Sequence, residues 1–274
     1  TGSRQDAKVR IYNPYNVKIE DEATKVASPD DIVEIHKHPV QILTYSSTYR
    51  MIISSDTEGF VEYWDVEEFG NPGLFEYKME TDLFTFQKDK TKPTSITVSP
   101  NGKYFAVVDT KSRVLVFHLK TAKIYRVYES NEALPEGVEQ ADVAKKLAHT
   151  KRMETEAHPA CNAIFDASSN LLIFSTWLGI NIVNLVTNDV EITLGDHEKN
   201  ERFLSVALYQ GKEEGSAIMG NLDTNATEDP TLFACSFRTN KFFLFTKRSG
   251  GEGRDILNEI PAKDDIAKVS NQKD

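Results

Sequence analysis

The chain is poor in cysteine and lacks long apolar segments, and each shortage excludes a class of protein. Cys161 and Cys235 are its two cysteines. Both lie in apolar stretches, which favours buried thiols in a reducing compartment over a disulfide framework. No apolar run approaches the roughly 20 residues that cross a bilayer, and residues 1–30 contain no apolar block typical of a secretory signal. We therefore expect a nuclear or cytosolic protein with no membrane partner.

Basic residues are also in the minority. Lys and Arg number 32 against 42 Asp and Glu, which gives a formal net charge of −10. Affinity for a phosphate backbone comes mainly from clustered Lys and Arg, so this balance argues against direct nucleic-acid binding. The motifs GxSxG, GxxxxGK[ST] and GxGxxG are absent. The sequence therefore indicates no catalytic residue, no cofactor and no small-molecule substrate.

What the chain has in abundance is short pieces of strand length, rich in β-branched and aromatic residues and separated by polar breaks. Three groups of four pieces can be distinguished: VQILTYS, YRMIISSD, GFVEYWD and LFEYKM; TSITVSPNG, KYFAVVD, RVLVFHL and KIYRVYE; NAIFDASSN, LLIFSTW, INIVNLV and VEITLG. A fourth group begins with FLSVALYQ at Phe203 and resumes with TLFACSF and KFFLFTK. Repeated four-stranded antiparallel units bury both faces when they stack radially, so the sequence predicts an all-β fold, a β-propeller.

The ring predicted for this chain is incomplete. VRIYN and VKIED at the N-terminal end read as the last two strands of one blade, and the fourth group lacks an outer strand. We expect four to five blades of a seven-bladed ring within residues 1–248. Because an open propeller leaves unpaired sheet edges, we expect the chain to be a piece of a longer protein.

Two insertions and a tail interrupt this pattern. Residues 131–158 are rich in Ala, Lys, Glu and Leu and predict a surface helix, with a partner-docking helix as the alternative. Residues 211–230 are polar and read as a loop insertion. Residues 249–274 begin with SGGEG and continue with many charges, which is typical of a flexible linker.

The repeats resemble the WD-repeat family, through VEYWD at 61–65 and SPNG at 99–102. The resemblance implies a blade network that runs from His through Ser or Thr and Asp to Trp. Its members here would be Trp64, Ser54, Asp56 and either His36 or His38. The other blades replace the Trp, so their networks are expected to be absent or different; the replacing residues are Phe117, Val183 and Phe245.

A closer resemblance is to the family that fuses WD repeats to a cyclophilin-type peptidyl-prolyl isomerase domain. It is carried by IHKHPVQILTYSSTYRMIISSDTEGFVEYW, FEYKMETDLFTFQKDKTKPTSITVSPNGK, LGINIVNLVTN and DILNEIPAKDDI. The resemblance implies a nuclear, spliceosome-associated protein, with further blades before Thr1 and an isomerase domain after the tail. The cyclophilin motifs FHR and GSQFF do not occur in this sequence, so it carries no catalytic residue of that family.

Few residues qualify as sites of another kind. His36 and His38 could share a metal ion, but no Cys-x-x-Cys pair or further ligand set accompanies them, so we predict no metal site. Trp177, which lies between two predicted strands, is a candidate anchor for a protein partner. The insertion adds three basic residues to this predicted interface, Lys145, Lys151 and Arg152.

These observations predict a non-catalytic scaffold that binds proteins, with splicing factors as the expected partners. Two alternatives remain open at this point. The chain could share in the isomerase activity of a parent enzyme, or it could be a WD-repeat adaptor of another complex, such as a ubiquitin-ligase receptor.

Overall fold

A computed structural model of the chain describes residues 6–15, 18–21, 26–129, 161–195, 201–210, 230–237 and 240–246. The chain divides into two compact units, Thr1–Tyr128 and Glu129–Asp274. The three predicted insertions and tails, at 131–158, 211–230 and 249–274, lie wholly or almost wholly outside the described residues. Each unit is described by itself.

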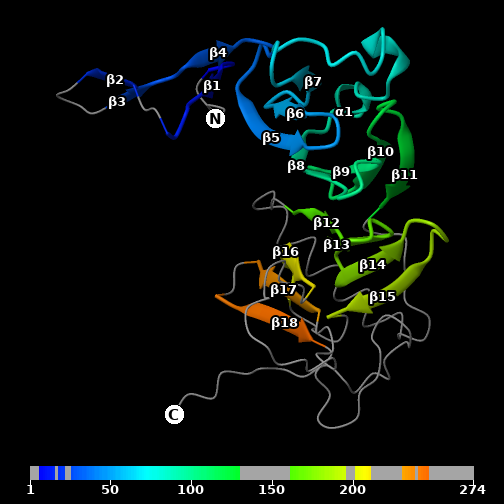
Figure 1. Cartoon of the computed structure of the whole chain (residues 1–274). Helices are drawn as coiled ribbons and strands as arrows, with labels where there is room; N and C mark the ends of the chain where they lie inside the picture. The colour runs from blue at the N-terminus through cyan, green and yellow to red at the C-terminus, as the bar shows by residue number, and fades with distance from the viewer. Residues whose placement is uncertain are drawn as a thin grey trace, which may run out of the picture. The chain divides into compact units, whose positions relative to one another are not determined.

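The first unit contains two blade-like sheets in which each strand pairs with the one that follows it (Figure 1). The first sheet has three strands, β5 (Val40–Ser46), β6 (Met51–Asp56) and β7 (Val61–Asp65). The second has four, β8 (Pro93–Val98), β9 (Tyr104–Asp109), β10 (Val114–His118) and β11 (Ile124–Tyr128). The segment of the chain that connects the two sheets contains a 3-10 turn, η1 (Lys78–Glu80), and the short helix α1 (Thr85–Lys88).

The second unit repeats this plan. One four-stranded antiparallel sheet consists of β12 (Ala163–Phe165), β13 (Leu171–Ser175), β14 (Ile180–Asn184) and β15 (Val190–Leu194). A three-stranded sheet follows, made of β16 (Phe203–Tyr209), β17 (Thr231–Ser236) and β18 (Phe242–Thr246). The all-β fold of successive blade-type sheets, predicted from the repeats, is confirmed.

Sheets within a unit bury apolar side chains against each other. All six residues of β9 are buried, which matches a strand covered on both faces. In the first unit the main cluster includes Phe105, Leu115 and Phe117, each at most 1% exposed. In the second unit Phe203 and Ile180 occupy the corresponding position between the two sheets. This burial is the main favourable contribution to folding.

Neighbouring sheets also share polar contacts at the first strand or at the residue directly before it. In the first unit the Gln41 side chain donates to the Pro93 carbonyl at 2.7 Å. In the second unit the Asn162 amide donates to the Val206 carbonyl at 2.9 Å and accepts from the Val206 N–H at 2.8 Å. A side-chain amide therefore fixes the register between adjacent sheets in both units.

Two strand predictions at the N-terminal side are wrong. VRIYN and VKIED do not pair as strands of one blade: β1 (Val9–Ile11) pairs with β4 (Asp31–Val33), and β2 (Lys18–Asp21) pairs with β3 (Val26–Ser28). LFEYKM forms no strand, and its end enters η1. Pro72 lacks a backbone N–H, and Gly73 adopts a φ of 71°, so the chain that leads into LFEYKM does not continue a ladder beside β7.

The structure also separates the two cysteines. Cys161 is buried, as predicted, whereas Cys235 is exposed. Cys235 lies on β17, where exposed and buried residues alternate, so its apolar neighbours in the sequence point to the opposite face. Among the residues that the structure describes, no helix is long and apolar enough to span a membrane.

Gly195 tests how tightly the second unit is packed. Its φ is 71°, and a Cβ there would lie 2.4 Å from Cε2 of the fully buried Phe203. Gly195→Ala should therefore lower the free energy of unfolding by about 3 kcal/mol, from backbone strain and overpacking together. Gly73→Ala is the control, because its φ is also 71° but no atom lies within 4 Å of the new Cβ. Urea unfolding should show a loss of about 1 kcal/mol for it, and equal losses would contradict the packing argument.

Candidate functional site

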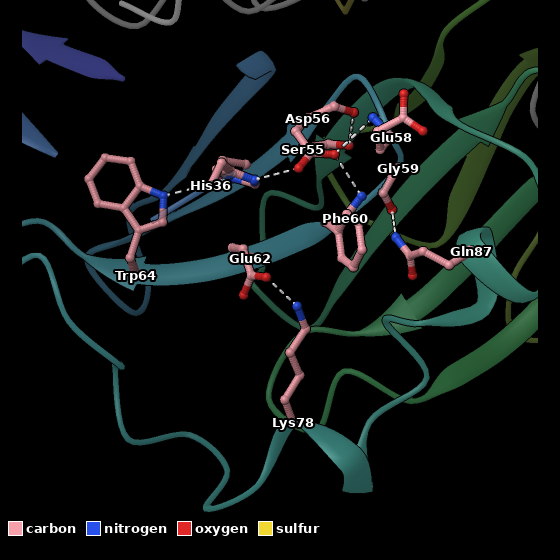
Figure 2. Close-up of polar contacts among 11 residues, drawn as sticks. His36, Ser55, Asp56, Glu58, Gly59, Phe60, Glu62, Trp64, Lys78 and Gln87 are labelled. Atoms are coloured by element: carbon pink, nitrogen blue, oxygen red, sulfur yellow. Dashed lines mark hydrogen bonds and ion pairs between the residues drawn. The ribbon is translucent and has the colours of Figure 1, made fainter. Parts of the chain in front are cut away.

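Four polar side chains meet between the first sheet and the segment that precedes it. Trp64 Nε1 donates to Ser54 Oγ at 3.0 Å, and Ser54 Oγ lies 2.6 Å from His36 Nε2. His36 Nδ1 in turn lies 3.3 Å from Asp56 Oδ2. Figure 2 shows the Trp64 indole, the His36 ring and Asp56 along this line. The structure thus brings together Trp64, Ser54, Asp56 and His36, and we call these four residues the blade network.

One arrangement of protons satisfies every member of the blade network. Asp56 Oδ1 accepts the backbone N–H groups of Glu58 and Phe60 at 3.0 and 2.9 Å, so the carboxylate acts as an acceptor throughout. His36 then donates from Nδ1 to Asp56, and its Nε2 accepts the Ser54 hydroxyl proton. Ser54 accepts the indole N–H with its remaining lone pair. A neutral imidazole therefore completes an unbroken chain of hydrogen bonds.

Burial lowers the pKa of His36, although the nearby Asp56 acts in the opposite direction. The side chains of both residues are only 1% exposed. The desolvation of an imidazolium here outweighs its attraction to the carboxylate. The ring is consequently neutral near pH 7, as the hydrogen-bond directions require.

The connectivity of Ser54, His36 and Asp56 is that of a hydrolytic triad, and its surroundings decide against catalysis. Ser54 is fully buried, and its hydroxyl oxygen already accepts the Trp64 N–H. A nucleophilic serine needs an approach path for a carbonyl carbon and donors for the resulting oxyanion. The blade network is therefore a structural device that joins three segments of the first unit.

His38 lies apart from the blade network. Its ring is exposed and stacks on Phe60 at a centroid distance of 6.3 Å. The two histidines therefore do not converge on a common point. In the described part of the chain, no group of three His, Cys, Asp or Glu side chains could hold a metal ion.

The second sheet has a different polar arrangement at the position that corresponds to Asp56. Asp109 ends β9 as Asp56 ends β6, and its Oδ1 accepts the N–H groups of Lys111 and Arg113, each at 2.9 Å. Its Oδ2 binds the Arg113 guanidinium at 2.8 Å, and this group also contacts Asp89 at 2.8 Å. Phe117 stands where the Trp would be, and it stacks on Phe105. The sequence predicted that the network here is absent or different, and it did not identify Arg113 as a member.

A buried arginine that the sequence analysis missed organises the second unit. Arg202 is fully buried and donates to the Thr176 and Phe203 carbonyls at 2.7 and 2.8 Å and to Cys161 Sγ at 3.3 Å. The adjacent Glu201 accepts the Ser236 hydroxyl and pairs with Lys241 at 2.8 Å. The one sequence feature that marks this site is the Glu-Arg pair directly before a strand. A charged pair at that place is typical of a solvated turn, so it did not indicate a buried arginine.

The predicted partner interface is only partly described. Trp177 lies in the turn between β13 and β14 and is half-buried, with its indole nitrogen covered. Lys145, Lys151 and Arg152 lie outside the described residues. The interface that the sequence predicts from Trp177 and these three basic residues therefore stays a prediction.

Comparison with known proteins identifies relatives over most of the chain. It is 34% identical to the peptidyl-prolyl cis-trans isomerase CYP71 of Arabidopsis thaliana, over 98% of this chain and 46% of that protein. It is 30% identical to the human peptidylprolyl isomerase domain and WD repeat-containing protein 1, over 85% of this chain and 40% of that protein. The chain therefore spans less than half the length of these relatives. No protein-family model matches it.

Among solved structures, the crystal structure of Sqt1 from Chaetomium thermophilum aligns with a TM-score of 0.48 at 13% identity. The alignment covers 86% of this chain and 50% of that protein.

Removing the Ser54 hydroxyl should break the blade network at its centre. Ser54→Ala leaves the Trp64 N–H and His36 Nε2 buried without partners, so the free energy of unfolding should fall by about 2–4 kcal/mol. Ser55→Ala is the matched control, because Ser55 is equally buried but makes one weak bond of 3.4 Å to a backbone carbonyl. It should cost less than about 1 kcal/mol in urea unfolding. Equal costs would show that the blade network adds nothing.

The lowered pKa of His36 predicts a stability that declines in mild acid. Below about pH 6.5 the His36 ring of the unfolded state binds a proton, whereas the ring in the folded state stays neutral until the pH falls further. Stability from this group is therefore complete above about pH 6.5 and falls by up to about 1.4 kcal/mol per pH unit below it, until the folded pKa is reached.

NMR titration of the histidine Cε1–H signals checks this, with the His36 signal identified by its loss in His36→Gln. Its midpoint should lie below the roughly 6.5 of the urea-unfolded chain. A midpoint at or above that value would contradict the neutral ring in the blade network.

Proposed function

The chain belongs to the family of WD-repeat-containing peptidyl-prolyl isomerases, and from this premise we propose that it acts as a non-catalytic scaffold for protein binding. We place that scaffold in a spliceosome-associated peptidyl-prolyl cis-trans isomerase that works in the nucleus. Splicing factors are the proposed partners.

One observation carries the proposal. Almost the whole chain aligns with less than half of a relative whose name denotes an isomerase, and its own sheets are blade-type sheets without cyclophilin motifs. The matched part therefore supplies WD repeats to a protein named for another activity. A fold alone does not establish a function, so the nuclear and splicing assignments depend on the resemblance described above.

The physical benefit of such a scaffold is proximity. Uncatalysed isomerisation of an X-Pro bond takes tens to hundreds of seconds. A binding module that holds a partner near a tethered isomerase raises the effective concentration of its prolines, into the millimolar range for short linkers. The half-buried Trp177, together with Lys145, Lys151 and Arg152, is the interface proposed from the sequence.

Affinity purification tests the scaffold and its partners. The tagged 274-residue chain, expressed in nuclei, should recover splicing proteins, and Trp177→Ala should reduce their recovery severalfold because a large aromatic anchor is lost. Phe242→Ala is the control, since it removes another large aromatic side chain, 64% exposed, that lies outside the predicted interface. Recovery of ubiquitin-ligase subunits without splicing proteins would replace this proposal by that of a ligase adaptor.

An isomerase assay separates the scaffold from the enzyme hypothesis. The purified chain should leave the rate of cis-trans exchange in a proline peptide at its uncatalysed value. Acceleration that a cyclophilin inhibitor abolishes would show that this chain contains an isomerase site.

A further inference from the structure

Basic side chains gather at one end of the second sheet, where the β8–β9 turn and the β10–β11 turn meet. The Leu119 N–H donates to the Lys103 carbonyl at 2.9 Å, and this bond joins the two turns. The His118 N–H donates to the Lys123 carbonyl at 2.9 Å and closes the second turn. Lys120 lies in that turn and Arg126 on β11. We call these five bases the basic patch: Lys103, His118, Lys120, Lys123 and Arg126.

Stacked aromatic rings hold part of the basic patch in place. Tyr104 stacks on Tyr125 at a centroid distance of 5.0 Å, and the His118 ring lies 5.2 Å from the first and 4.9 Å from the second. The Lys103 ammonium lies over the Tyr104 ring, 5.1 Å from its centroid, and the Arg126 guanidinium lies over Tyr125 at 4.9 Å. Because a cation is attracted to a ring face, these two charges are positioned before any ligand binds.

The basic patch is accessible, and its charges are not neutralised within the described part of the chain. Lys103, Lys120 and Lys123 are exposed, whereas His118 and Arg126 are half-buried. None of the five forms an ion pair with a described residue. The three lysine ammonium groups are therefore open to a partner.

Few carboxylates lie near these bases. Between residues 99 and 128 of the sequence Asp109 is the one acid, and it binds Arg113 at the opposite end of β9. Asp82 contacts the patch end from another segment, where its carboxylate accepts the Ile124 N–H at 2.8 Å. The basic patch therefore keeps a net positive charge, although the whole chain carries −10.

The histidine of the patch responds to this surplus of positive charge. Burial lowers the pKa of His118, and the charge of Lys103 lowers it further. A nearby cation acts in this direction because it disfavours the imidazolium. An anion bound at the patch would act in the opposite direction.

The surroundings of the basic patch favour an acidic protein segment over a nucleic acid. Single strands bind by stacking their bases on open aromatic faces. Here Tyr104 and Tyr125 face each other, and Lys103 and Arg126 lie over the same two rings. The net charge of −10 also repels a long polyanion. An extended acidic segment needs no stacking platform, and its alternate side chains, about 7 Å apart on one face, can reach bases that belong to two turns.

We propose that the basic patch is the docking site for an extended, acidic segment of a partner protein. Aspartate or glutamate side chains of the segment pair with the exposed Lys103, Lys120 and Lys123, and the segment passes beside the half-buried His118. Ion pairs at a surface are individually weak, so the affinity depends on several of them together and falls as salt rises.

This inference deepens the scaffold function and depends on it. A synthetic peptide replaces the cellular partner in the test, so the two proposals fail separately. The probe is a capped nine-residue peptide in which five glutamates alternate with serines, added to the full 274-residue chain at low salt. One control peptide carries lysine in place of glutamate. A six-nucleotide oligouridine, whose five phosphates match the five glutamates in charge, represents nucleic acid.

We expect the glutamate peptide to bind, and the lysine peptide and the oligouridine to bind at least about tenfold more weakly. Because carboxylates near the ring favour the imidazolium, the bound peptide should raise the NMR titration midpoint of His118, whose signal is identified by its loss in His118→Gln. His38, exposed beside Phe60 of the first sheet, is the internal control and should keep its midpoint.

Two double variants separate the basic patch from a general charge effect. Lys103→Gln with Lys123→Gln should weaken the glutamate peptide severalfold, because two of its ion pairs are lost. Lys37→Gln with Lys88→Gln is the control, since it removes two exposed lysines outside the patch and should leave the affinity unchanged. All four lysines are exposed, so both double variants should keep the midpoint of urea unfolding of the unmodified chain.

Several outcomes would overturn the proposal. Equal binding of the glutamate and lysine peptides, or equal losses in the two double variants, would mean that the charges of the basic patch do not select the ligand. Oligouridine that binds as tightly as the glutamate peptide would assign the patch to nucleic acid. A bound peptide that leaves the His118 midpoint unchanged would place the binding elsewhere on the chain. No binding at about 1 mM peptide would leave the basic patch without the proposed occupant.

Discussion

Burial on both faces of the sheets dominates the physics of this protein. A strand such as β9 is buried at all six of its residues, so its sheet cannot exist as a solvated layer and needs a neighbour against each face. Polar contacts also cross between neighbouring sheets, through Gln41 of β5 in one unit and through Asn162, directly before β12, in the other. Hydrophobic burial supplies most of the free energy, and these directional bonds select one register.

The residue that ends or directly follows the second strand of each sheet is a recurrent polar point. In the four blade-type sheets it is Asp56, Asp109, Thr176 and Ser236, and all four are buried. Each is satisfied by a different group: an imidazole, a guanidinium, backbone N–H groups of its own turn, and a carboxylate. Because a buried polar atom must find a partner but any suitable donor or acceptor will serve, sheets of one shape tolerate divergent sequences at this point.

The sequence predicted the strands wherever apolar residues ran between polar breaks, as in β8 to β15. The resemblance to WD repeats implied Trp64, Ser54 and Asp56 as members of the blade network. It left the choice between His36 and His38 open because residues two apart on an extended segment share a face; only burial distinguishes them. The fourth strand expected at LFEYKM does not form, because Pro72 and Gly73 interrupt the ladder before the residues with high β propensity begin. The pairing of β1 with β4 and the burial of Arg202 depend on contacts distant in sequence, which local patterns do not encode.

The two tryptophans of the chain fall one in each compact unit, Trp64 in the first and Trp177 in the second. Each unit therefore has its own fluorophore, one fully enclosed in a hydrogen-bonded chain and one half-covered in a turn. Indole emission from a chain that keeps only one of them reports on that unit alone. The degree to which the two units melt as a single cooperative system is therefore accessible to ordinary fluorescence, without any added label.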